Sequence, residues 1–138
     1  MSRRDPNFLH PALAFAFGYA KPEFEATHQG YQVILTDTFR TQKEQHELYQ
    51  IGRTKDKDKK IVTTCDGYRK MSRHNYDPAL AMDVAFVKDG KCDWNLELFR
   101  DFAKLINQAE SQIEWGYSLW NWDAPHFQLP LSFAENNT

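Results

Sequence analysis

The sequence lacks any apolar run of the roughly 20 residues that a membrane-spanning helix needs. Its formal net charge is only −2, whereas domains that bind nucleic acids are usually basic. It has two cysteines, Cys65 and Cys92, and no C-x-x-C pair that would indicate a structural zinc site. These absences predict a protein with no stable membrane insertion and no nucleic-acid partner. The two thiols either form a disulfide or, as we expect, stay reduced.

A signal peptide, an internal repeat and a low-complexity tract are also missing. The basic start is followed by a short apolar stretch, residues 12–20, that has no cleavage site and is interpreted as a core helix. The length of 138 residues predicts one domain, spanning residues 1–138, that can bury a core without disulfides or a structural metal. Any bound metal is therefore expected to be catalytic, and the protein is expected to be a monomer made in the cytoplasm.

Hydrophobic periodicity indicates helices before and after several short strands. Helices are predicted at residues 11–19, 22–30 and 95–109, and a capping box of Thr41 and Glu44 predicts another that ends near Gly52. Residues 31–36, 82–87 and 126–129 have the β-branched or alternating pattern of strands. Residues 53–60 carry charges of both signs and are expected to form an exposed loop. The pattern predicts an α+β fold with a small, mainly antiparallel sheet and flanking helices.

Three side chains of metal-ligand type lie where the predicted strands have a polar face. Asp83 alternates with the apolar residues of its strand, and His126 alternates with Phe127 in the last strand. A carboxylate on a small sheet needs a partner, which is either a metal ion or a basic side chain. His74, Asp83 and His126 form a three-ligand set with one open position, as catalytic zinc requires. The other histidines are expected to be exposed or to cap helices: His10, His28 and His46.

Two acidic residues precede the last ligand of this set. Asp123 stands three residues before His126, and the Asp-Ala-Pro segment forms a turn that can bring both side chains to one cleft. There Asp123 can accept a proton from the attacking water, although the turn alone would also explain an aspartate at this position. Glu114 lies farther back and is expected to orient a ligand histidine instead. Asp123 is therefore the predicted general base.

Three blocks of the sequence resemble, in order, a known family of zinc peptidases. The family includes D-Ala-D-Ala carboxypeptidases and phage L-alanyl-D-glutamate endopeptidases (endolysins), and it shares its fold with the amino-terminal domain of hedgehog proteins. The first block covers residues 36–54 and contains Arg40. The second combines Ser72-x-His74 with Ala81-x-Asp83. The third combines Glu114-Trp115-Gly116 and Trp120 with Asp123-x-Pro125-His126-Phe127.

The resemblance implies a role for each matching residue. It implies that the three-ligand set binds Zn²⁺ and that Asp123 is the catalytic carboxylate. Arg40 would hold a substrate carboxylate through its planar fork, although its residue type alone favours a surface ion pair. Ser72 would hydrogen-bond near the substrate or orient its loop. The sequence departs from the family pattern in a longer loop between the first two ligands, and in Tyr117, which replaces the second glycine of a pair.

The predicted function is that of a zinc metallopeptidase that hydrolyses peptidoglycan stem peptides at the L-Ala–D-Glu bond, as phage endolysins do. The alternatives are a D-Ala-D-Ala carboxypeptidase and a non-catalytic, zinc-containing binding module. The final block favours the endopeptidase, and Asp123 beside His126 argues against the module. Without a wall-binding domain or signal peptide, the protein is expected to act in phage lysis, reaching the periplasmic cell wall after release. A virion-associated or host-encoded hydrolase is the alternative origin.

Overall fold

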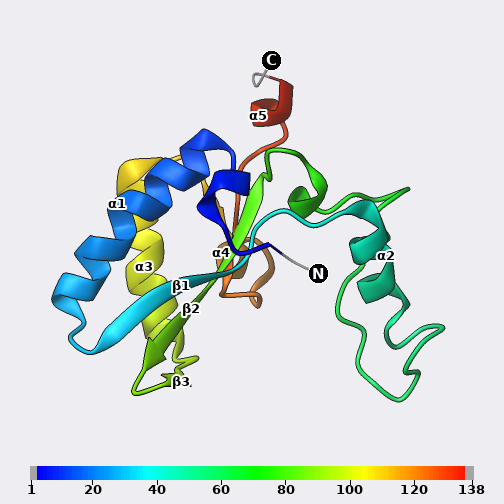
Figure 1. The fold of residues 1–138 in the computed structure, drawn as a ribbon, viewed down its shortest axis with the longest axis horizontal. Coiled ribbons are helices and arrows are strands. Elements are labelled where there is room, and N and C mark those ends of the chain that lie inside the picture. Colours follow the sequence, from blue (N-terminus) through cyan, green and yellow to red (C-terminus); the bar gives the residue numbers. More distant parts are fainter. Residues whose placement is uncertain (1–2, 136–138) are drawn as a thin grey trace.

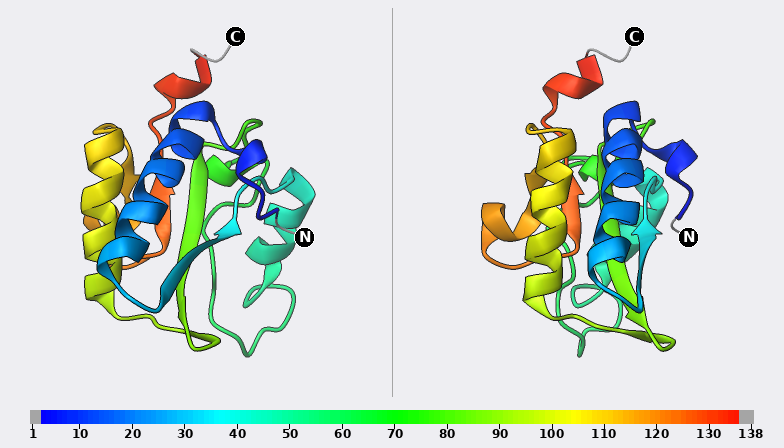
Figure 2. Two further views of the ribbon diagram at one scale, coloured as in Figure 1. Left: turned by 60° about the vertical axis from the view of Figure 1, so that its left-hand side comes forward. Right: turned by 90° about the vertical axis from the view of Figure 1, so that its left-hand side faces the viewer.

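A five-stranded antiparallel sheet forms the centre of the fold, and two long helices lie side by side on one of its faces (Figures 1 and 2). The computed structural model describes residues 3–135. The strands are β1 (Tyr31–Asp37), β2 (Ala81–Lys88), β3 (Lys91–Cys92), β4 (Glu114–Trp115) and β5 (His126–Gln128). Their order is β1-β2-β5-β4, with β3 paired to β2. The predicted α+β fold with a small antiparallel sheet is confirmed.

Two helices cover the sheet and the shorter ones lie around it. The two that pack on the sheet are α1 (Pro11–Thr27) and α3 (Leu96–Ala109). The others are α2 (Gln42–Gln50), α4 (Gly116–Trp120) and α5 (Ser132–Glu135), with 3₁₀ turns η1 (Pro6–Phe8) and η2 (Arg73–Asn75). The predicted capping box starts α2, because Thr41 Oγ1 accepts from the Glu44 amide and the Glu44 carboxylate accepts from the Thr41 amide.

Helix α1 differs from the prediction, which placed a break before Pro22 and a second helix up to residue 30. One continuous helix runs through Pro22 and ends at Thr27. An interior proline costs a helix about 3 kcal/mol because it removes one hydrogen bond. The side chains along the inner face of α1, from Leu13 to Phe24, are fully or almost fully buried, and burial of each large one contributes about 1.5–3 kcal/mol. Tertiary packing therefore outweighs the local preference to stop.

The two faces of the sheet have different compositions because side chains alternate along each strand. In β2, Met82, Val84 and Phe86 point to the helices and are fully buried. The Phe86 ring lies between Phe24 of α1 and Phe99 of α3, with ring centroids 4.8 and 4.6 Å away. Asp83 points to the opposite face. The helices therefore cover the apolar face of the sheet, and the face that carries Asp83 is not covered by α1 or α3.

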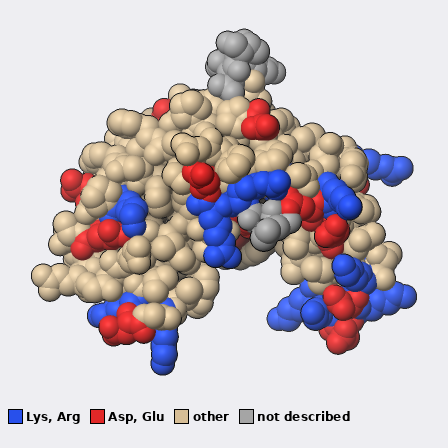
Figure 3. Space-filling model, viewed as in Figure 1, with Lys and Arg blue, Asp and Glu red and all other residues tan. Residues whose placement is uncertain are grey.

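A second lobe lies on the other side of the sheet from α1 and α3 (Figure 1). It consists of α2 and the long loop that follows, and its tip carries positively and negatively charged side chains close together (Figure 3). Residues 54–60 of this loop are exposed, as expected from their charges. None of the helices within residues 3–135 has the length and apolar character needed to cross a membrane.

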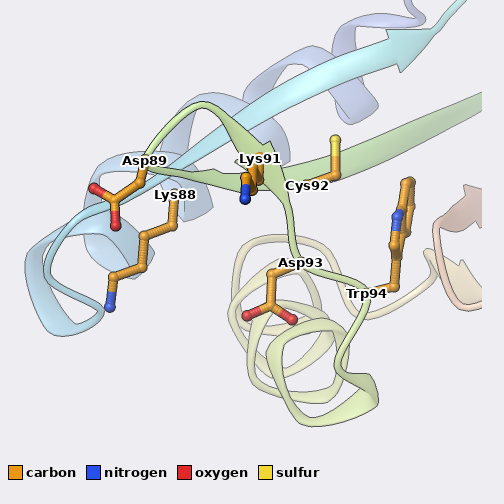
Figure 4. Close-up of a pocket in the computed structure, with 6 residues that line it drawn as sticks. All are labelled: Lys88, Asp89, Lys91, Cys92, Asp93 and Trp94. Carbon is orange, nitrogen blue, oxygen red and sulfur yellow. The ribbon is translucent and has the colours of Figure 1, made fainter.

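A shallow hollow beside the β2–β3 turn is shown in Figure 4. Its lining residues are Lys88, Asp89, Lys91, Cys92, Asp93 and Trp94. Lys88, at its outer end, lies five residues and therefore about 17 Å along β2 from Asp83. The hollow therefore belongs to the β2–β3 turn and is separate from Asp83 at the other end of β2.

Candidate metal centre

The three-ligand set comes together at one end of the sheet. Asp83 in β2 and His126 in β5 are direct partners in the antiparallel register, and His74 comes from the η2 turn. One ligand atom from each residue lies within 4.8 Å of the others. His126 Nδ1 is 3.1 Å from Asp83 Oδ1, and His74 Nε2 is 3.4 Å from Asp83 Oδ2. Sequence positions 74, 83 and 126 therefore supply one compact group of nitrogen and oxygen atoms.

Hydrogen bonds at the far side of each imidazole ring decide which nitrogen faces this group. His74 Nδ1 lies 2.7 Å from the Thr38 carbonyl oxygen and therefore carries the proton that it donates. This leaves His74 Nε2 with its lone pair directed at the other ligands, and it is one of two buried side-chain atoms within residues 3–135 that have no hydrogen-bond partner. An acceptor atom that is buried without a partner fits a site for a metal ion.

The second histidine is oriented by side chains alone. His126 Nε2 lies 2.9 Å from Gln128 Oε1, so it donates to the amide oxygen and leaves Nδ1 for the ligand group. Gln128 Nε2 in turn donates to Glu114 Oε1 at 3.2 Å. This chain, which we call the Glu114–Gln128 relay, holds the ring and its tautomer as outer-shell partners of metal-binding histidines do. Glu114 thus supports a ligand histidine, the role expected for it from the sequence.

The electrostatics of the group favour a cation. Burial alone would raise the pKa of the Asp83 carboxyl, but the adjacent rings of His74 and His126 hold it well below its usual range. Burial lowers the pKa of His126, and the Asp83 carboxylate more than offsets this and raises it. Asp83 is therefore ionised, and a positive charge, from a proton or a metal ion, is stabilised between it and the histidines.

Asp123 lies at the edge of the same group. Its backbone has a φ of 47°, in the left-handed region, and its carbonyl accepts from the His126 amide at 3.2 Å. This turn brings the side chain toward the ligands although it stands three residues from His126. Burial raises the pKa of the Asp123 carboxyl; Asp83 adds to the rise, while the charges of the histidines and Arg40 oppose it. A raised pKa suits a group that must accept a proton and then release it.

Gly116 explains how the turn can pass so close to α4. A Cβ atom at this position would lie 2.5 Å from the Asp123 carbonyl oxygen and 3.1 Å from His126 Cβ. No side chain fits at 2.5 Å from a backbone oxygen, so the glycine is needed for the approach. The first glycine of the pair in the family pattern is thus retained for a steric reason. Tyr117, at the position of the second, packs against Trp115 with ring centroids 5.2 Å apart.

Comparison with known proteins places these residues in a family. Over 133 residues, 90% of this chain and 75% of its relative, the sequence is 35% identical to the peptidoglycan L-alanyl-D-glutamate endopeptidase CwlK of Bacillus subtilis. No family model matches the sequence. The chain belongs to the zinc peptidase family of L-alanyl-D-glutamate endopeptidases and D-Ala-D-Ala carboxypeptidases. It is therefore a metallopeptidase, as the sequence blocks indicated.

Two solved structures share the fold of this family member. The L-Ala D-Glu endopeptidase ChiX of Serratia marcescens superposes with a TM-score of 0.63 at 20% identity, over 96% of this chain and 90% of that one. A variant of the vancomycin resistance D,D-pentapeptidase VanY, in complex with Zn(II), gives a TM-score of 0.52 at 17% identity, over 88% and 74%. The helix-covered antiparallel sheet is thus the fold of known peptidases.

Arg40 is almost fully buried next to the metal centre and is fixed in place. Its Nη1 donates to Gln45 Oε1 at 2.7 Å and its Nη2 donates to Asp37 Oδ2 at 2.6 Å. Its Nε is the second buried atom of the described residues without a partner. The ion pair considered from the sequence does exist, but it is partly buried, because Asp37 is only partly exposed and Arg40 is almost fully buried. Arg40 keeps unused N–H groups that can bind a carboxylate.

Ser72 holds the loop that carries the first ligand. Its Oγ accepts from the His74 amide at 3.2 Å, and its own amide donates to Asn75 Oδ1 at 2.8 Å. Asn75 Nδ2 donates to the Arg40 carbonyl, and the Arg40 amide donates to the His74 carbonyl. These bonds fit the loop-orienting role predicted for Ser72, and its hydrogen bond near the substrate stays a prediction.

Sequence reasoning missed two members of the site. Gln128 shares a strand face with His126 because they are two residues apart, and that spacing was a signal that could have identified it. Thr38 acts through its backbone carbonyl, so its residue type gives no signal. Thr38 is therefore identified only when the partner of His74 Nδ1 is located in the structure.

Proposed function

We propose that this protein hydrolyses the L-Ala–D-Glu bond of peptidoglycan stem peptides, with Zn²⁺ held by His74 Nε2, Asp83 and His126 Nδ1. The observation that carries the proposal is the convergence of these three atoms beside Asp123, in a chain 35% identical to an enzyme with this activity. When bound, zinc lowers the pKa of a water molecule to about 7 and polarises a carbonyl group. The rest of the chemistry comes from the chain itself.

Asp123 is the proposed general base and acid. It takes a proton from the attacking water as the water oxygen bonds to the L-Ala carbonyl carbon. When the carbon–nitrogen bond breaks, Asp123 delivers that proton to the departing nitrogen of D-Glu. Its raised pKa brings proton uptake and release closer to neutral pH than for an exposed aspartate. The partly buried Glu114–Gln128 relay keeps the His126 ring in the orientation that this arrangement needs.

Arg40 is proposed to bind a substrate carboxylate. D-Glu is linked to the next stem residue through its side chain, so its α-carboxylate is free and lies next to the scissile amide. A buried guanidinium with unused N–H groups recognises such a carboxylate strongly because the bond is charge-assisted and desolvated. Asp37 and Gln45 fix the guanidinium before the substrate arrives, which lowers the entropy cost of binding.

Mass analysis of digested peptidoglycan tests which bond the enzyme cleaves. The purified zinc-loaded enzyme is expected to release peptides that begin with D-Glu and to leave L-Ala on the glycan. Release of free D-Ala alone would replace this proposal with the D-Ala-D-Ala carboxypeptidase. If zinc binds and no peptide is released, the protein is a binding module.

A pair of variants tests the role of Asp123. Asp123→Asn is expected to keep zinc and fold while losing about 10²–10⁴-fold in kcat, as general acid–base groups do. Glu114→Gln is the matched control, because its side-chain oxygen can still accept from Gln128, and it is expected to lose less. If Glu114→Gln lost more activity than Asp123→Asn with zinc retained in both, the base would be misassigned.

The origin and place of action are further proposals. We infer from the final sequence block that the enzyme serves in phage lysis and reaches the wall only after release. The named relatives are a Bacillus enzyme, a Serratia enzyme and a resistance enzyme. Expression in the cytoplasm of a Gram-negative host, with and without a pore-forming protein, tests this idea. Lysis without the pore would contradict it.

A further inference from the structure

Two large aromatic side chains are exposed beside the metal centre. Trp120 at the end of α4 is 45% exposed, and Trp122 in the following turn is 61% exposed. Their ring centroids are 6.4 Å apart, and the Trp120 ring is 5.5 Å from the His126 ring. Neither hydrogen bonds nor core packing account for this pair, which we call the tryptophan platform. An aromatic surface that stays exposed next to a catalytic group suggests a ligand.

The platform is held in place by its neighbours in the chain. Trp115, by contrast, is buried and its Nε1 donates to the Ala124 carbonyl at 2.7 Å, which ties the two ends of this segment together. Asn121, which lies between the two tryptophans in the sequence, has a φ of 62° and ends the short helix α4. The backbone of the segment is therefore fixed while the two indole faces remain accessible. Such a rigid aromatic surface binds at low entropy cost.

The chemistry of the proposed substrate requires a binding site at this distance. In peptidoglycan the nitrogen of L-Ala is acylated by the lactyl group of an N-acetylmuramic acid residue in the glycan strand. Only one amino acid, about 3.5 Å long, therefore separates the scissile bond from the group that joins the sugar. An enzyme that cuts after L-Ala must place the sugar within several ångströms of its metal, and the Trp120 ring is at that range from a metal ligand.

The sheet order decides on which side of the site the sugar must lie. Arg40 follows β1, at one end of the order β1-β2-β5-β4, and its amide bonds to the His74 carbonyl. The platform follows β4, at the other end, and contacts His126. In Figure 2 (right), α4 and the start of α2 lie on opposite sides of β5. If Arg40 binds D-Glu on one side of the scissile bond, L-Ala and the sugar extend toward the platform.

We propose that Trp120 and Trp122 form a subsite for the N-acetylmuramic acid residue that carries the stem peptide. This inference rests on the proposed L-Ala–D-Glu cleavage. The negative face of each indole ring attracts the C–H groups on the face of a pyranose ring, and the sugar hydroxyls stay in water. The subsite makes the enzyme specific for stem peptides that are still attached to glycan.

Two substrates that differ only in the sugar test the subsite. One is N-acetylmuramyl-L-Ala-γ-D-Glu-L-Lys; the other has an acetyl group in place of the muramyl group, so the L-Ala nitrogen is acylated in both. Trp122→Ala is the main variant, because the ring of Trp122 packs against Trp120, whereas the ring of Trp120 itself contacts His126. Its kcat/KM is expected to fall roughly three- to tenfold on the muramyl peptide, the range of one aromatic contact, and distinctly less on the acetyl peptide.

Trp94→Ala is the matched control. Trp94 is 60% exposed and lines the hollow of Figure 4. It stacks on Phe99 of α3, on the face of the sheet opposite Asp83, and its loss should leave turnover of both substrates unaffected. Trp120→Phe keeps an aromatic face next to His126 and should retain more of the preference for the sugar than Trp120→Ala. Equal losses on the two substrates for Trp122→Ala and Trp120→Ala would overturn the subsite.

A binding measurement separates this inference from the proposed function. N-acetylmuramyl-L-alanine is titrated into the zinc-loaded protein while the indole N–H signals of its four tryptophans are followed by NMR. The signals of Trp120 and Trp122 are expected to shift and that of Trp94 to stay, with N-acetyl-L-alanine having little effect at the same concentration. Unchanged platform signals overturn the subsite even if L-Ala–D-Glu cleavage is observed. If neither substrate is cleaved, the proposed function fails whatever the titration shows.

Discussion

Replacing Gln128 by leucine should weaken zinc binding more than it weakens the fold. Gln128 is buried, and its amide oxygen is the acceptor for His126 Nε2. When His126 Nδ1 binds a metal, Nε2 must carry the proton and needs that acceptor. In the metal-free protein the ring can change its tautomer or take up a second proton beside Asp83. The cost of losing Gln128 therefore falls mainly on the zinc-loaded state.

The magnitude follows from the cost of a buried donor without a partner. That cost is about 1–3 kcal/mol, which raises the dissociation constant for zinc by roughly 5- to 150-fold. Loss of an outer-shell partner typically weakens metal binding by about 10- to 100-fold, which agrees. Leucine has nearly the volume of glutamine, so the variant adds no large cavity. Glu114→Gln should have a smaller effect because it retains an acceptor for Gln128.

Competition with a coloured chelator measures the zinc affinity, and thermal unfolding of the metal-free protein measures the fold. Gln32→Leu is the matched control, because Gln32 is an exposed glutamine of β1 that pairs with Val87, remote from the site. We expect weaker zinc binding for Gln128→Leu alone. If its zinc affinity stayed within twofold of the wild type, the relay would have no role in holding His126.

Three further predictions concern the metal, the turn and pH. Chelation of zinc should leave the far-UV circular dichroism unchanged and lower the melting temperature by several degrees. The reason is that zinc at 100 times its dissociation constant adds about 2.7 kcal/mol to the free energy of unfolding. Loss of the helix signal on chelation would contradict this prediction. Gly116→Ala should reduce kcat by about tenfold or more by displacing Asp123, while Gly18→Ala, where a Cβ meets no atom within 4 Å, should not. Zinc affinity should rise from pH 6 to pH 8, because His126, whose pKa Asp83 raises above 6.5 against the effect of burial, must lose its proton. A zinc affinity that does not change with pH would refute the assignment. In the metal-free protein the stability that the His126–Asp83 ion pair contributes is present below pH 6.5 and is lost as the pH rises through the raised pKa of His126.

Local patterns were sufficient where one residue type decides the structure. The capping box of Thr41 and Glu44 predicted the start of α2, and the alternation in β2 predicted that Asp83 faces away from the core. Both depend on chemistry within a few residues. The family resemblance added which distant residues belong together, and the structure brings one ligand atom of each within 4.8 Å of the others.

Other features could not be predicted because they depend on tertiary contacts. The continuous path of α1 through Pro22 depends on helix packing that a local window cannot contain. The two-residue strand β4 is too short for any periodic signal, yet its register places Glu114 opposite Gln128. The need for Gly116 follows from the approach of a turn seven residues later in the chain. In each case the deciding partner is absent from the local sequence.

The apolar face of the sheet sets the geometry of the metal face. Met82 pairs with Phe127, both fully buried, directly beside the pair of Asp83 with His126. A slip of one residue between β2 and β5 would turn Phe127 out of the core and His126 into it. The cost of exposing Phe127 and of placing an imidazole among apolar side chains therefore holds the two ligands opposite each other without any metal. The core thus preorganises the site, so that little of the free energy of zinc binding is needed to bring the ligands together.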